Sequence, residues 1–240
     1  MGPTVNAAPR SGHAVSAGLG RVWNTPRYLL LLLVTCIALA SLSGCQAARY
    51  RALEAMGVEK RDILVSRVER ARDAQDDARD QFTSALERFR ATVEVDGGEL
   101  EETYSRLSRE HDQSVRRARA VSDRINAVES VATDLFKEWE QEIDLYSDPG
   151  LAARSRDILR DTRSNYGRML TAMRRAEASM EPVLAVFQDQ VLFLKHNLNA
   201  IAIASLRQEL AGIEQATAAL LEDMEVAIQQ ADAFLTTLSS

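Results

Sequence analysis

Glycine, proline and aromatic residues are scarce in this chain of 240 residues, which has 11 glycines, 5 prolines and 5% aromatic side chains. Glycine and proline punctuate loop-rich folds, so their scarcity excludes a chain built from many short turns. The only two cysteines, Cys36 and Cys45, lie near the amino terminus, which excludes a disulfide framework for the rest of the chain. With 46% hydrophobic and 27% charged residues, the composition predicts long helices joined by few turns.

Acidic residues are missing from the first 44 positions, which contain three arginines followed by an apolar run from Leu29 to Leu42. This run of about 14 residues is shorter than the roughly 20 residues needed to cross a bilayer. A positive flank before a short apolar run is typical of a secretory signal peptide. We therefore predict that residues 1–44 are a signal peptide, with an uncleaved amino-terminal anchor as the alternative.

The apolar run ends in a four-residue sequence that looks like a bacterial lipobox, formed by Leu42, Ser43, Gly44 and Cys45. In lipoprotein precursors the thiol at this junction becomes a diacylglyceryl thioether, the signal is removed before it, and the new amine is acylated. Two or more acyl chains hold a protein stably in a membrane. We predict lipidation at Cys45, with residues 45–50 as a short tether and the membrane as a partner through this anchor.

The residue after the predicted lipidation site is Gln46. In the proteobacterial sorting rule an Asp at that position retains the protein at the inner membrane, so Gln favours the outer membrane and the periplasmic side of the envelope. Removal of residues 1–44 removes three basic residues and no acidic one, which leaves a net charge of −9. Such an acidic body has no general attraction to nucleic acid, and none is expected as a partner.

The remaining chain has the apolar periodicity of an elongated helical bundle. From Leu53 onward apolar residues recur at alternating steps of three and four, as in the seam of a coiled coil. The pattern breaks at residues 96–98 and again at 147–150, where Asp148 is a plausible N-cap. We predict one domain over residues 51–240, all-α, with antiparallel helices at about 51–95, 99–147, 149–195 and 199–238.

Two of the seams define the expected core in detail. The first helix should bury Leu64, Val68, Ala71, Gln75, Ala78, Phe82, Ala85 and Phe89. The third should bury Leu151, Ser155, Ile158, Thr162, Tyr166, Met169, Met173, Ala176 and Met180. In the last seam Thr217 is the one polar member, and a helix can satisfy its hydroxyl on its own backbone.

A polar interruption in the apolar stretch from Val191 to Leu206 decides between three and four helices. It consists of Lys195, His196, Asn197 and Asn199. A reversal here gives a third helix as long as the first two, and it lays the acidic segment 207–240 along the basic segment 151–175. Against it, the apolar stripe keeps its phase and no Gly or Pro marks a turn. We favour a reversal and four helices, with a polar core layer in one continuous helix as the alternative.

Residues 183–206 are apolar on nearly all sides, and such a helix must be covered. This makes the stripe a candidate surface for self-association or for an envelope protein partner, through Val183, Phe187, Val191, Leu194, Leu198 and Ile201. No clustered metal ligands, phosphate-binding loop or nucleophile motif is present. We therefore expect no catalytic residue, metal, cofactor or small-molecule substrate.

Three long stretches of the sequence resemble an uncharacterised bacterial family, domain of unknown function 2959. They are "KRDILVSRVERARDAQDDARDQF", "VATDLFKEWEQEI" and "MEPVLAVFQDQVLFLKHNLNAIAIASL", and the resemblance covers roughly residues 50–238. It implies a helical, often lipid-anchored envelope protein, and it carries over no catalytic or binding residues.

The sequence therefore favours a non-enzymatic, membrane-anchored periplasmic lipoprotein that acts as a spacer, scaffold or partner-binding coiled-coil module. One alternative is a membrane-shaping helical dimer that resembles the banana-shaped BAR modules. It would need a basic face, for which the dense candidates are Arg116, Arg117, Arg119, Arg174 and Arg175. A second alternative is a ligand-binding bundle centred on His196.

Overall fold

The computed structural model describes residues 59–94, 100–197 and 200–239. They form four helices: α2 (Lys60–Val93), α3 (Leu100–Ile143), α4 (Pro149–His196) and α5 (Ala200–Ser239). At 1.5 Å per residue the helices are about 50 to 70 Å long. The predicted helical sequence before Lys60 lies outside the described residues.

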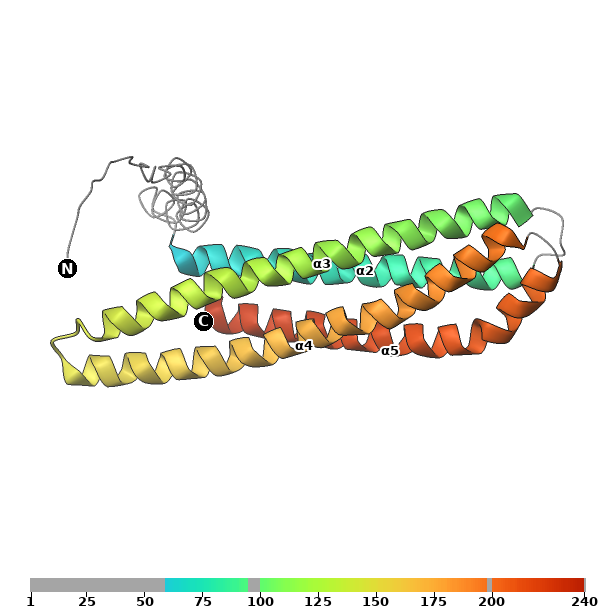
Figure 1. The fold of residues 1–240 in the computed structure, drawn as a ribbon. Helices are drawn as coiled ribbons and strands as arrows, with labels where there is room; N and C mark the ends of the chain where they lie inside the picture. Colours follow the sequence, from blue (N-terminus) through green and yellow to red (C-terminus); the bar gives the residue numbers. More distant parts are fainter. Residues whose placement is uncertain (1–58, 95–99, 198–199, 240) are drawn as a thin grey trace, which may run out of the picture. The chain divides into compact units, whose positions relative to one another are not determined.

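The helices pack as a four-membered antiparallel bundle in which each helix has two neighbours (Figure 1). α2 packs against α3 and α5, and α4 packs against the same two helices. The all-α bundle and the favoured reversal near residues 195–199 are thus confirmed. We call the end where α2 begins and α5 ends the open end, and the end where α4 gives way to α5 the far end.

Both ends of α4 are closed by side chains. At the start of α4 the Asp148 carboxylate accepts hydrogen bonds from the backbone N–H groups of Gly150 (2.7 Å) and Leu151 (3.3 Å), which confirms the predicted N-cap. At the other end of α4, Asn197 Nδ2 donates to the carbonyl of Phe193 at 3.0 Å. The Asn197 backbone N–H also donates to the carbonyl of Leu194 at 3.2 Å, so this end of α4 closes without a residue in the left-handed conformation.

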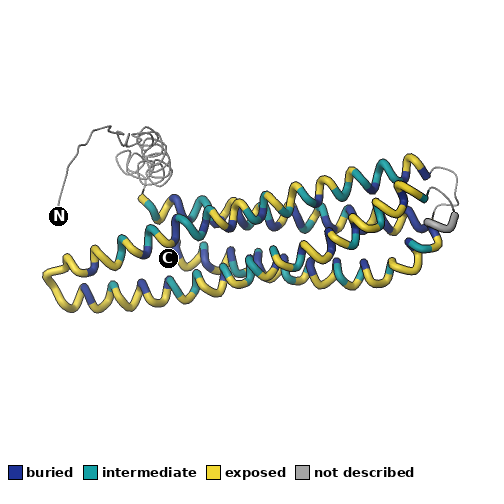
Figure 2. Tube along the Cα trace, viewed as in Figure 1, coloured by how far each residue is buried: buried dark blue, intermediate teal, exposed yellow. Residues whose placement is uncertain are grey.

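A continuous apolar core runs along the bundle axis (Figure 2). All eight predicted seam positions of α2 are buried, from Leu64 to Phe89. Aromatic side chains join the helices across the core, since Phe89 stacks on Phe187 with ring centroids 6.2 Å apart. The helices are thus held together chiefly by removal of apolar side chains from water, as their periodicity predicts.

The predicted seam of α4 is wrong at two positions in its first three turns. Leu151 and Ile158 are exposed, whereas their neighbours Ala152 and Leu159 are buried. The cause is a stagger of the helix ends: Lys60 Nζ lies 2.7 Å from Glu138 Oε1, so α3 continues past the first residue of α2. Among the described helices, only α3 is left for α4 to pack against in this overhang, and a different face of α4 is covered.

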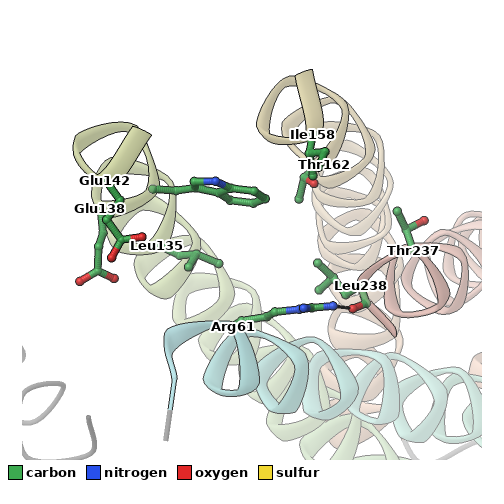
Figure 3. A pocket seen from close by; sticks show the side chains of 9 residues that line it. Arg61, Leu135, Glu138, Glu142, Ile158, Thr162, Thr237 and Leu238 are labelled. Atoms are coloured by element: carbon green, nitrogen blue, oxygen red, sulfur yellow. Dashed lines mark hydrogen bonds between the residues drawn. The ribbon is translucent and has the colours of Figure 1, made fainter. Parts of the chain in front are cut away.

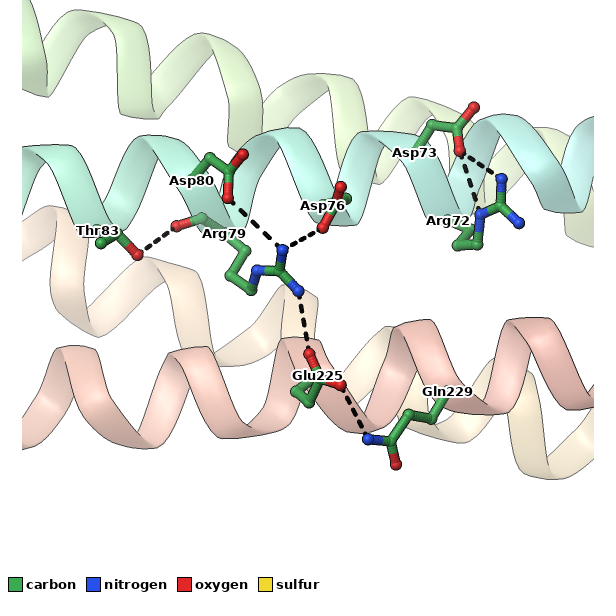
Figure 4. A network of polar contacts seen from close by, with 8 residues as sticks. All are labelled: Arg72, Asp73, Asp76, Arg79, Asp80, Thr83, Glu225 and Gln229. Atoms are coloured by element: carbon green, nitrogen blue, oxygen red, sulfur yellow. Dashed lines mark hydrogen bonds and ion pairs between the residues drawn. The ribbon is translucent and has the colours of Figure 1, made fainter.

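Ion pairs between α2 and α5 follow one register, and Figure 4 shows one of them, the pair of Arg79 with Glu225. Arg79 lies 3.0 Å from Glu225, and Arg90 lies 2.6 Å from Glu214. From the first pair to the second, the position moves eleven residues forward along α2 and eleven residues back along α5. Arg72 lies 3.0 Å from Asp232, seven residues before Arg79 and seven after Glu225, so this pair has the same register. Exposed pairs contribute only tenths of a kcal/mol each, but together they favour this register.

The predicted match between acidic α5 and basic α4 is largely wrong. Between the described parts of these two helices one ion pair forms, in which Arg175 lies 2.8 Å from Asp223. The other paired acids of α5 contact α2, and Arg163 and Arg174 of α4 pair with acids of α3. The segment 151–160 lies at the open end, where α5 stops, so the two segments are out of step.

Two buried side chains interrupt the apolar core without finding full hydrogen bonding. Gln75 is fully buried, its Nε2 is 3.5 Å from the carbonyl of Met173, and its Oε1 has no hydrogen-bond partner. Thr217 is also fully buried, and its hydroxyl has no partner either. The prediction that Thr217 bonds to its own helix backbone is therefore wrong. Buried polar groups without a hydrogen-bond partner lower the free energy of unfolding, so both side chains destabilise the core.

Candidate functional site

The open end of the bundle contains a cleft of about 420 Å³ (Figure 3). It forms where α3 and α4 run on beyond the first residue of α2. Its walls come from all four helices and are mostly apolar, with charged groups at the edge: Arg61, Leu135, Glu138, Trp139, Glu142, Ile158, Thr162, Thr237 and Leu238. This is a concave, largely apolar surface of the kind that ligands and partners use.

The polar groups around this cleft are tied to the fold. The Trp139 indole N–H donates to Ser155 Oγ at 2.9 Å, which links α3 to α4. Arg61 of α2 donates to the carbonyl of Leu238, close to the end of α5. A cation at a helix carboxyl end is favourable because it faces the negative end of the helix dipole. Both contacts join neighbouring helices, so these polar groups hold the walls of the cleft in place.

Beyond the cleft, the turn between α3 and α4 forms an apolar tip. We define the tip as residues 144–151, in which Leu145 is 82% exposed, Tyr146 is 49% exposed and Leu151 is 45% exposed. The two acids of the tip are both engaged, because Asp148 caps α4 and Asp144 lies 3.6 Å from Arg156. Large exposed apolar side chains grouped at one end of a protein commonly mark an interaction surface.

A second cleft, of about 520 Å³, lies between α3 and α4 in the half of the bundle nearer the far end. Its lining includes His111, Arg119, Glu177 and Glu181. His111 Nδ1 is 3.5 Å from Asp112 Oδ1, and Glu177 accepts from Arg174 at 2.6 Å. Of its two glutamates, Glu177 is thus already committed to a cation within α4, and His111 is held at the bundle surface.

One half-buried aromatic residue, Tyr166, has a perturbed ionisation. Burial raises the pKa of the Tyr166 phenol to about 12, and the nearby negative charge of Glu129 adds to the rise while Arg174 opposes it. The ring packs edge-on against Phe136 at 5.3 Å and near Phe234 at 6.0 Å. A phenol in this setting stays protonated and serves as a packing residue that ties α3, α4 and α5 together.

The polar residues predicted as a core layer or a turn lie at the far end. Lys195 and His196 are exposed at the last two positions of α4, and Asn197 is half-buried just after it. Asn199 lies outside the described residues. The alternative of a buried polar layer centred on His196 is therefore contradicted at Lys195 and His196, because the chain reverses here and leaves both in solvent.

Most of the apolar stripe predicted as an interface faces the inside of the bundle. Val183, Phe187 and Leu194 are buried and Val191 is half-buried, since α5 folds back over this face. Leu198 and the side chain of Ile201 lie outside the described residues. The described part of the stripe is thus covered by other helices of the same chain. The exposed apolar residues of this segment are instead Leu192 and Phe193.

The arginines that a membrane-shaping face would need are largely paired. Arg117 lies 2.7 Å from Asp77, Arg175 lies 2.8 Å from Asp223, and Arg174 contacts Glu129 and Glu177. Arg116 and Arg119 remain as exposed cations on α3. Because the paired charges cancel locally, these five positions do not add up to a strongly basic face.

The lipobox residues Leu42, Ser43 and Gly44, and the lipidation site Cys45, lie outside the described residues. Within the described ranges, no three His, Cys, Asp or Glu side chains group as metal ligands would. None of the four described helices has an apolar stretch long enough to cross a membrane. The cleft at the open end and the exposed tip are thus the surfaces with a distinct chemistry in the part of the chain that is described.

Reasoning from the sequence misses this site, although the seams contain some of its residues. In the second predicted helix the spacing of three and four runs from Leu100 to Tyr146, which makes Leu135 and Trp139 ordinary core positions and Tyr146 the last position of that seam. The sequence offers no clear signal for it, because the predicted helices 51–95, 99–147 and 149–195 are nearly equal in length. The excess length of α3 and α4 over α2, which begins at Lys60, is seen only in the structure.

Comparison with protein families supports one assignment. A family described as "Protein of unknown function (DUF2959)" matches residues 49–238. No curated protein and no solved structure matches the chain.

Proposed function

The chain belongs to the DUF2959 family, and we propose that it is a non-enzymatic, lipid-anchored spacer of the bacterial cell envelope. In this proposal the acyl chains on Cys45 hold the open end of the bundle to the membrane. The helical body then stands in the periplasm as a scaffold that presents its far end to a partner. The outer membrane is the favoured location, because Gln46 follows the anchor.

The observation that carries the proposal is the place where the chain enters the bundle. α2 begins at Lys60, beside Glu138 and therefore at the open end. From that level α3 and α4 run the length of the bundle to the far end, and α3 alone has 44 residues, or about 66 Å. A chain attached to a membrane through its amino terminus thus carries its far end tens of ångströms away from the attachment point.

Contacts between helices support a body that keeps its length. α2 is joined to α5 by the ion pairs of Arg79 and Arg90, and to α3 by the pair of Lys60 with Glu138. α3 is joined to α4 by Arg163, which pairs with Glu140 and also lies over the Phe136 ring at 5.2 Å. Neighbouring helices are therefore linked by side chains as well as by the core, which resists sliding of one helix along another.

The content of the core supports a structural role over a catalytic one. Its described polar members are uncharged, and three are hydroxyls that a helix backbone or a neighbour satisfies; Ser114, for example, donates to the carbonyl of Glu110 at 2.9 Å. The far end carries exposed Leu192 and Phe193, which suit contact with a second copy or an envelope protein. These side chains take the place of the buried stripe as the candidate partner surface.

Metabolic labelling with a palmitate analogue tests the anchor. The wild-type chain, expressed with its own leader, should take up the label and fractionate with membranes. A Cys45→Ser variant should lose the label and appear in the soluble fraction. Label that persists in this variant, or a wild-type protein that is soluble and unlabelled, would refute the anchored spacer.

Small-angle scattering tests the spacer itself. The purified chain should have a maximum dimension set by helices of about 66 Å or more. A compact particle of the size expected for a globular chain of this length would contradict the proposal. This measurement is independent of acylation, so each part of the proposal has its own test.

A further inference from the structure

The placement of the tip at the open end points to a second membrane contact. We propose that Leu145, Tyr146 and Leu151 insert into the interface of the bilayer that holds the acyl chains of Cys45. This inference rests on the proposed anchor and deepens it, because it names the surface that orients the bundle. The partner is a lipid surface, recognised through apolar insertion and not through charge.

Connectivity brings the tip to the membrane. Fourteen residues, 46–59, separate Cys45 from Lys60, and such a length spans at most about 50 Å. The tip projects past the point where this tether joins the bundle, since α3 runs on for five residues after Glu138, or about 8 Å. Among the described residues, the tip is therefore the part of the bundle placed to meet the membrane first.

The side chains of the tip suit the interfacial region of a bilayer. Two leucines and a tyrosine are exposed there, and Trp139 lies one helical turn before the end of α3. Tyrosine and tryptophan are enriched at membrane interfaces, where an apolar ring meets the polar head groups. Leu145, the most exposed of the three, is the residue expected to enter most deeply.

Charge at the tip does not oppose insertion into a neutral surface. Asp148 already accepts two backbone hydrogen bonds and Asp144 is paired with Arg156, so neither carboxylate would be buried without a partner. Residues 137–163 carry five basic and seven acidic side chains, a net charge of −2. The tip therefore favours zwitterionic lipid over anionic lipid, to which it has no net attraction.

The test uses the acylated full chain in vesicles of zwitterionic phosphatidylcholine. Leu145→Cys gives a single labelling site, because the mature chain's other cysteine is blocked by its acyl group. The label is an environment-sensitive fluorophore, and the quencher is a nitroxide carried on the lipid. The matched control is Leu192→Cys, an exposed apolar position (46%) at the far end, about 60 Å along α4 from Leu151.

Quenching at position 145 is expected to exceed quenching at position 192 by at least five-fold. A second variant checks the chemistry: with the label moved to Leu151→Cys, replacing Leu145 by Asp should lower the quenching to the level of the far-end control. Insertion of the tip predicts both results, whereas flexible tethering alone predicts neither.

Several outcomes would overturn the inference. Equally weak quenching at both positions means that the tip stays in water, and equally strong quenching means that the bundle lies flat. Unlabelled Leu145→Cys protein that is oxidised to a disulfide-linked pair of copies on the vesicles indicates a dimer joined at the tips. Flotation and the mass of the acylated peptide are measured first, so that a missing anchor, which would sink both proposals, is distinguished from an anchored protein whose tip does not insert.

Discussion

Replacing Gln75 by Met should make the protein more stable, although it removes a native hydrogen-bonding group. Gln75 is fully buried on α2, and its Oε1 has no hydrogen-bond partner. The hydrogen bond that its amide donates, from Nε2 to the carbonyl of Met173, is 3.5 Å long and therefore weak. Methionine has nearly the same length and flexibility, so it can fill the same space without a polar atom to desolvate.

The size of the gain follows from these opposing terms. An unsatisfied buried acceptor costs about 1 to 3 kcal/mol, whereas a typical net hydrogen bond contributes about 1 kcal/mol, and less at this distance. The expected increase in the free energy of unfolding is therefore about 1 to 2 kcal/mol. For a folded body of this size that corresponds to a rise in melting temperature of roughly 2 to 8 °C.

Circular dichroism during urea and thermal denaturation measures the change, with the urea m value as a check that the unfolded state is unaltered. Gln75→Ala is the control for volume, because it removes the polar group but leaves a cavity, and it should lose about 2 kcal/mol or more. A less stable Gln75→Met variant with an unchanged m value would refute the reasoning. It would mean that the amide is well satisfied in the folded core.

Three further predictions concern the cap, the buried phenol and the ion pairs. Asp148→Ala should destabilise the protein by about 1 kcal/mol in thermal denaturation, because two N-terminal N–H groups of α4 lose their acceptor, whereas Asp148→Asn should cost little. The Tyr166 phenol should titrate near pH 12 in ultraviolet absorbance; since its pKa is raised, its contribution to stability is present below about pH 10 and is lost as the pH rises toward 12, and Tyr166→Phe should abolish that loss. Reversing Arg90 to Glu should cost a few tenths of a kcal/mol at low salt, and adding Glu214→Arg should restore it, with both effects fading in 1 M salt. If the double variant is no more stable than the Arg90→Glu variant, the register between α2 and α5 does not depend on this contact.

Much of the fold was predictable because apolar periodicity reports which face of each helix is covered. Every predicted seam position of α2 is buried, and the turn at Asp148 was visible from residue types alone. Helix length favoured the reversal at residues 195–199. The hydrogen bond from Asn197 to the carbonyl of Phe193, which closes the end of α4, is a local interaction that apolar periodicity does not reveal.

The errors share one physical origin. The predictions for Leu151 and Ile158 extended a seam to the end of its helix, as if neighbours were present along its whole length. The predicted pairing of α4 with α5 likewise matched charges by segment and ignored where each helix ends. Thr217 was assumed to satisfy itself, but its hydroxyl orientation depends on what surrounds it in the core.

The open-end cleft and the tip could not be read from the chain for the same reason. Trp139 and Leu135 repeat the seam spacing as faithfully as any core residue, and both are only half-buried because α2 begins and α5 ends beside them. The exposure of Leu145 and Tyr146 likewise follows from their position beyond the first residue of α2, a relation between segments about 80 residues apart.

By itself the sequence determined that this protein is built from long helices and which face of most of them is covered, since these depend on local propensity and on a period of 3.6 residues. It favoured four helices over three, and the structure decided for four. Only the tertiary structure decided the stagger of the helix ends, the partner of each charged side chain and the place of the cleft and tip. Those features depend on where one helix stops relative to another, and side-chain packing along the whole bundle sets that relation.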